Sequence, residues 1–184
     1  MNERDRDESG RPRSDRPRDS LGRPLPPGSQ GVPRIPDEIE LSPTETLSYA
    51  QDLLDRGLAF NAHEVFEVAW KKAPDGERSL WQGLAQLAVA ITHVQRGNID
   101  GAVTVLCRAA ARLADDERGA PYGIDAAGLL EYAGDLVADL TVGDKVTPKR
   151  FVPVCLWRGP GSGTGSWTSF IICRRCLAIV RAGK

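Results

Sequence analysis

The chain of 184 residues has room for one ordinary domain with terminal extensions, and its formal net charge of −1 hides an uneven distribution. Residues 38–144 carry eight Lys or Arg against eighteen Asp or Glu, whereas residues 145–184 carry eight basic residues and no acidic one. Because phosphate binding needs a cationic surface, nucleic acid is an unlikely main partner for the acidic region, although the basic end could contact it.

Residues 1–37 are predicted to form a disordered tail. They are rich in Arg, Asp, Pro, Gly and Ser and contain few side chains that a core could bury. Such a tail serves solubility or contact with a partner, or it is a solvated extension with no specific role.

The first helix is predicted between Ser42 and Gly57. Ser42 suits the N-cap, Pro43 the first helical position, and Glu45 completes a capping box. Apolar residues then recur at helical spacing, and Gly57 suits the end of the helix.

The second helix is predicted over the stretch FNAHEVFEVAW and ends near Ala73, before a Pro-Asp-Gly turn. Asn61 is the expected N-cap, with Glu64 as its capping-box partner. Phe60 and Val65 have the spacing of a hydrophobic staple across this start.

Three more helices follow. The third, from Glu77 to Arg96, carries no charge from Leu80 to Val94, which predicts a central, buried helix. Asn98 suits the N-cap of the fourth, and the fifth extends from about residue 125 to residue 141. Five helices with short connections predict an all-α bundle over residues 38–144.

His63 and Glu67 lie one helical turn apart, so the carboxylate can reach the imidazole ring. The third helix carries its own polar line, formed by Gln82, Gln86 and His93. Buried amides and imidazoles need hydrogen-bond partners, so we expect these five residues to form a structural network that joins the two helices.

An antiparallel pairing about the Pro-Asp-Gly turn places His63 opposite Gln86, and Glu67 opposite Gln82 and Gly83. His93 then lies about six residues further along, on the order of 9 Å away at 1.5 Å per residue.

A metal-dependent hydrolase that uses His63, Glu67 and His93 is the alternative, with His63, Glu64 and Glu67 as its catalytic candidates. The stretch His-Glu-Val-Phe-Glu lacks the second histidine of the zincin signature, and a catalytic zinc needs three protein ligands. A binding or interaction module without a cofactor is therefore the leading hypothesis, and a divalent metal belongs to the alternative.

Trp70 and Trp81 are predicted to be core residues or anchors of an interface with a protein partner or a second copy of the chain. The segment GNIDGAVTVLCRAAARL also resembles half of a tetratricopeptide repeat, but no second copy appears at a 34-residue period.

Residues 145–184 are predicted to be an irregular extension outside the bundle, since they mix short β-prone runs with a Gly/Ser linker. Cys173 and Cys176 form a lone Cys-x-x-Cys pair, which Cys155 could complete only to three metal ligands. A poorly ordered extension and a shifted reading frame are the other interpretations of this region.

The N-terminus lacks the apolar segment of a secretory signal, and no apolar run approaches the roughly 20 residues of a membrane span. Four cysteines do not form a disulfide-dense framework. We therefore expect a cytoplasmic protein with reduced cysteines and no membrane association.

The combination HEVFEVAW, WQGLAQLAVAITHVQRGN and GAVTVLCRAAARL resembles the bacterial family called domain of unknown function 309. The resemblance covers roughly residues 44–115 and implies a small helical bundle without an established activity. It does not extend to the head or the tail of the chain. The matching positions are His63, Glu64, Glu67, Trp70, Gln82, Gly83, Leu84, His93, Gly97, Asn98, Gly101 and Ala102.

Overall fold

A computed structural model describes residues 16–115 and 121–142. These residues form five α-helices and two short 3-10 turns, with no strand among them, which confirms the all-α prediction. The elements are α1 (Pro43–Asp55), α2 (Ala59–Lys72), η1 (Asp75–Glu77), α3 (Arg78–Gln95), α4 (Ile99–Asp115), η2 (Pro121–Gly123) and α5 (Ala126–Val142).

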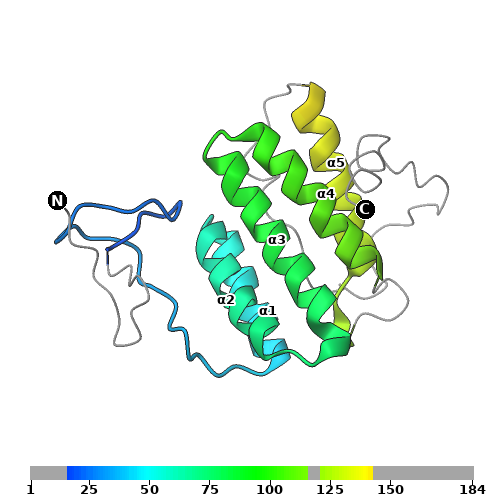
Figure 1. The fold of residues 1–184 in the computed structure, drawn as a ribbon, viewed down its shortest axis with the longest axis horizontal. Helices are drawn as coiled ribbons and strands as arrows, with labels where there is room; N and C mark the ends of the chain where they lie inside the picture. Colours follow the sequence, from blue (N-terminus) through cyan, green and yellow to red (C-terminus); the bar gives the residue numbers. More distant parts are fainter. Residues whose placement is uncertain (1–15, 116–120, 143–184) are drawn as a thin grey trace.

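Each helix packs against the next one along the chain, so the bundle is a series of helical hairpins. Helices α2, α3 and α4 lie side by side, with α1 against α2 and α5 against α4 (Figure 1). Helix α3 lies in the middle of this series and has more buried residues than any other described helix, which explains why its sequence is uncharged over most of its length. None of the described helices has the length and apolar character that crossing a bilayer requires.

The start of α1 follows the predicted capping box. The Ser42 hydroxyl accepts from the backbone N–H of Glu45 at 3.3 Å, and the Glu45 carboxylate accepts from the backbone N–H of Ser42 at 2.9 Å. Gly57 adopts a φ of +75° just after the helix, a conformation that costs glycine little and other residues more.

The predicted cap of the second helix is wrong. Helix α2 begins at Ala59, with Leu58 at the cap position and no side-chain cap. Leu58 donates its N–H to the carbonyl of Leu53 at 2.8 Å, and the next helix starts at once. Asn61 consequently lies inside the first turn of α2, where it is buried and cannot act as a cap.

Trp81 belongs to the core, with only 2% of its surface exposed. Its ring centroid lies 6.5 Å from that of Phe66 and 6.2 Å from that of Tyr122. Trp70 is partly buried and packs against the same core. Of the two roles predicted for Trp81, the burial supports the core role.

Gly83 faces α4, whereas the pairing about the Pro-Asp-Gly turn places it opposite Glu67. A Cβ atom added at Gly83 would lie 3.1 Å from the side chain of Leu113 on α4. Gly83 therefore lies on the face of α3 that packs against α4, where the missing side chain allows a close approach of the two helices.

Residues 16–37, part of the segment that composition predicts to be disordered, follow a defined irregular path in the structure. Arg18 forms isolated bridges with Pro24 and Val32, and Ile35 is buried in the core at 5% exposure. Arg96, the C-cap residue of α3, donates from Nε to the carbonyl of Leu21 at 2.8 Å, which ties the segment to the helices. Residues 1–15 and the predicted extension, residues 145–184, lie outside the described residues.

Candidate functional site

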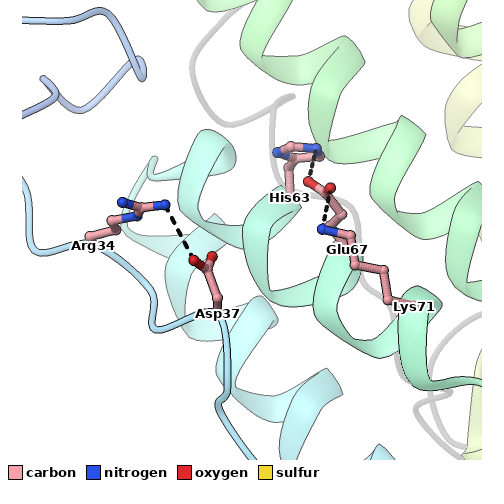
Figure 2. A network of polar contacts seen from close by, with 5 residues as sticks. All are labelled: Arg34, Asp37, His63, Glu67 and Lys71. Carbon is pink, nitrogen blue, oxygen red and sulfur yellow. Dashed lines mark hydrogen bonds and ion pairs between the residues drawn. The ribbon is translucent and has the colours of Figure 1, made fainter. Parts of the chain in front are cut away.

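Helix α2 carries a ladder of three charged or titratable side chains at i, i+4 spacing, drawn in Figure 2. Nε2 of His63 lies 3.3 Å from one oxygen of Glu67, and Nζ of Lys71 lies 2.8 Å from the other. The predicted pairing of His63 with Glu67 is present in this ladder. Helical spacing brings the groups together without help from another element.

The His63 side chain is 23% exposed, and its ring centroid lies 5.8 Å from that of Phe60. Burial lowers the pKa of His63 below its ordinary value of 6.5, an effect that the nearby Glu67 carboxylate opposes. A neutral ring whose Nε2–H faces Glu67 leaves Nδ1 as an acceptor, and Nδ1 is buried without a partner among the described residues.

The polar line of α3 does not complete the expected network. Oε1 of Gln86 is buried and, like Nδ1 of His63, has no partner among the described side chains. His93 lies at the end of α3, where Nδ1 is 2.9 Å from the Asn98 amide nitrogen. Gln82 is half-buried. The structure thus brings His63 to Glu67, and places His93 in a separate contact at the start of α4.

Residues 16–115 and 121–142 contain no group of three or more His, Cys, Asp or Glu side chains that could hold a metal ion. The hydrolase triad of His63, Glu67 and His93 is therefore not assembled. The tail candidates Cys155, Cys173 and Cys176 lie outside the described residues.

A cleft of about 470 Å³ lies between the N-terminal segment and α2. Helix α2 contributes Phe60, Asn61 and Glu64, and the N-terminal segment contributes the opposite wall. Its lining residues on that wall are Arg16, Pro17, Arg18, Asp19, Gly28, Ser29, Gly31, Val32 and Arg34.

Asn61 is the buried polar residue of this cleft, with 4% of its surface exposed. Its amide nitrogen donates to the carbonyl of Pro33 at 3.2 Å. A carbonyl can only accept, so this contact fixes the orientation of the amide and turns Oδ1 away from Pro33. Oδ1 is buried and has no hydrogen-bond partner in the described part of the chain.

Glu64 is the other acceptor on the α2 wall. Burial raises the pKa of its carboxyl group, while the guanidinium groups of Arg34 and Arg18 act in the opposite direction. The two walls therefore differ: the α2 side offers acceptor oxygens, and the N-terminal segment contributes three of the cleft's arginines.

Two arginines of the opposite wall have defined contacts. Arg18 donates from Nη1 to the carbonyl of Gly22 at 2.7 Å and lies 5.5 Å from the Phe60 ring centroid. Arg34 lies 3.4 Å from Asp37, and both side chains of this pair are mostly exposed (Figure 2).

A second cleft, of about 220 Å³, lies beside Trp81 and is lined mainly by apolar side chains. Its carboxylate, Glu77, accepts from Trp81 Nε1 at 3.2 Å and from the Tyr122 hydroxyl at 2.8 Å. The hydrogen bond to Glu77 raises the pKa of Tyr122. Because these contacts engage both oxygens of Glu77, the larger cleft is the better candidate site.

The cleft was not predicted from the sequence, because Asn61 has the pattern of a helix cap and residues 1–37 have the composition of a disordered tail. The available signal was a set of apolar residues within the charged segment, above all Val32 and Ile35, since a solvated tail has no use for them.

The fold and the site define an all-α protein with a polar cleft on its second helix. Residues 47–105 match the family model described as Domain of unknown function (DUF309), which confirms the resemblance over these residues. Asn61, His63, Glu64 and Glu67 lie within the match, whereas the N-terminal wall of the cleft lies outside it.

A segment of 74 residues is 36% identical to "Uncharacterized protein YpuF" of Bacillus subtilis (strain 168). The aligned segment covers 39% of this chain and 42% of the relative, so the chain spans less than half the length of the curated relative that it matches. No solved structure matches the chain.

Proposed function

We propose that this protein is a binding module whose ligand occupies the cleft between residues 16–34 and α2. The observation that carries the proposal is Asn61, a residue of the cleft lining whose Oδ1 is a buried acceptor without a partner among the described residues. An unsatisfied buried acceptor costs roughly 1–3 kcal/mol, and a ligand that donates a hydrogen bond to it recovers part of that cost.

The dimensions of the cleft support a small ligand. Its volume of about 470 Å³ falls within the roughly 300–1,000 Å³ of small-molecule sites. Among the described residues, the large apolar side chains that are exposed are Ile99, Tyr122 and Val142. Three such residues give less support to a large apolar interface with a partner or a second copy.

His63, Glu67 and Lys71 have a structural role in this proposal. Their ladder occupies the same helix as Asn61 and Glu64 and stabilises its surface. A hydrolase centred on His63 would need further metal ligands, and among the described side chains the carboxylate paired with His63 is Glu67.

The test is a thermal-shift screen of the full chain against a library of small polar metabolites, followed by two matched variants. Ser29 lines the cleft, so Ser29→Trp should fill it and abolish stabilisation by any ligand that binds there. Ser20 is exposed in the same segment and does not line the cleft, so Ser20→Trp should leave that stabilisation unchanged.

A ligand that stabilises wild type and Ser20→Trp, but not Ser29→Trp, supports the proposal. If the screen finds no stabilising compound, or if both variants respond like wild type, the cleft is not the binding site.

A further inference from the structure

We infer that the ligand of this cleft is a small organic anion that also carries a hydrogen-bond donor, as hydroxy acids and amino acids do. The inference rests on the proposed function and names the chemistry of its ligand. It depends on the different character of the two walls of the cleft, which face one ligand from opposite sides.

The α2 wall is suited to a ligand group that donates a hydrogen bond. Asn61 is 4% exposed and its amide nitrogen donates to Pro33, so its acceptor Oδ1 is the atom that still needs a hydrogen-bond donor among the described residues. Glu64, the other polar residue on this wall, contributes a carboxyl group. A hydroxyl or an ammonium group satisfies both residues, whereas a bare carboxylate or an apolar group satisfies neither.

The opposite wall is suited to an anionic ligand group. It carries Arg16, Arg18 and Arg34, so three arginines line the cleft together with the acidic residues Asp19 and Glu64. A guanidinium group binds a carboxylate or a phosphate through paired N–H donors.

The carboxylate of Asp19 is already engaged in its own turn. Oδ1 accepts from the backbone N–H groups of Leu21 at 3.0 Å and Arg23 at 2.7 Å. This engagement reduces its competition with a ligand for the arginines.

Arg34 is the arginine best suited to exchange partners. Its contact with Asp37 is 3.4 Å long, and the two side chains are 57% and 84% exposed. Exposed ion pairs of this kind contribute little free energy, so an anionic ligand can replace Asp37 at small cost. Arg18 instead stays at the Gly22 carbonyl and over Phe60, where it supports the wall.

The experiment compares succinate, L-malate and L-aspartate by calorimetry on the full chain at low ionic strength. These four-carbon dicarboxylates differ at one carbon, which carries hydrogen, hydroxyl or ammonium. Malate or aspartate should bind roughly five- to tenfold more tightly than succinate, the ratio expected for one hydrogen bond to a buried acceptor.

Substitutions in each wall of the cleft, with one control, test which wall recognises which part of the ligand. Arg34→Gln should weaken binding of all three compounds about tenfold, as loss of a charge-assisted contact does. Arg23→Gln is the matched control, because Arg23 is exposed in the same segment and does not line the cleft. Asn61→Leu should remove the preference for malate or aspartate over succinate.

Equal affinity for the three compounds, or equal loss in Arg34→Gln and Arg23→Gln, would overturn the inference. Absence of binding by all three would also overturn it. In that case, a library compound whose effect is lost in Ser29→Trp would preserve the proposed function, whereas a screen without any such compound would remove both.

Discussion

The contact between α3 and α4 and the contact between α2 and the N-terminal segment show two ways of joining elements in this molecule. The first is apolar and tight: Gly83 of α3 permits close approach of Leu113, and Leu84 and Leu106 are almost fully buried. The second contains Asn61, arginines and irregular backbone, and it encloses a cleft of about 470 Å³.

Apolar and polar contacts between elements differ in how completely they fill space and satisfy polar atoms. Apolar side chains need only complementary shape, so they can fill the space between two helices completely. Polar groups need a partner for each donor and acceptor, and Asn61 leaves its acceptor without one among the described residues. We therefore expect stability to depend mainly on the first contact and ligand binding on the second.

The largest effect is expected from Leu113→Ala, which removes a fully buried side chain at the α3–α4 contact. It should lower the free energy of unfolding by about 3 kcal/mol through lost burial and a residual cavity. Urea unfolding followed by circular dichroism measures this change.

A second substitution sharpens the result. Gly83→Ala gains up to about 1 kcal/mol of helix propensity, but in wild type its new methyl group meets Leu113 at 3.1 Å. In the Leu113→Ala background the obstacle is gone, so Gly83→Ala should be more favourable there. Strict additivity of the two changes would show that the glycine does not serve this contact.

Asn61→Leu tests the polar contact and should have a smaller global effect, within about 1 kcal/mol, because it removes the hydrogen bond to Pro33 together with the unpartnered acceptor. The main consequence should be local. Trypsin should cleave after Arg18 or Arg34 faster in the variant, while urea unfolding of the helices changes little. An equal loss in both measurements would contradict the separation of the two contacts.

The buried imidazole of His63 should make the free energy of unfolding depend on pH. Burial lowers its folded-state pKa below the ordinary 6.5, so the unfolded chain binds the proton first as the pH falls. The contribution of His63 is complete above pH 6.5 and is lost as the pH decreases from that value through the folded-state pKa. His63→Gln should therefore flatten the stability profile below pH 6.5, as measured by urea unfolding at several pH values, and a parallel profile would refute this.

The smallest effect is expected from Lys71→Met. Its ion pair with Glu67 spans one helical turn, and the Lys71 side chain is 64% exposed. Such pairs contribute about 0.2–0.5 kcal/mol, so thermal unfolding should shift only slightly and less in high salt. A loss above about 1 kcal/mol would mean that the His63–Glu67–Lys71 ladder has more than a surface role.

The number and the approximate extent of the helices were predictable from the sequence, because they depend on local rules. The apolar period, the Ser42 capping box and Gly57 act within a few residues, and the structure retains all three. The pairing of His63 with Glu67 was predictable for the same reason, since both lie on one helix.

The surroundings of each polar and small residue, in contrast, depend on how the helices pack. Asn61 has the sequence signature of a cap, but the tight connection at Leu58 starts α2 earlier and buries Asn61 against Pro33, 28 residues away. Gly83 was expected to face Glu67 on α2, but in the packed bundle it lies on the face of α3 that contacts α4. Such contacts join positions far apart in the chain, and no local pattern encodes them.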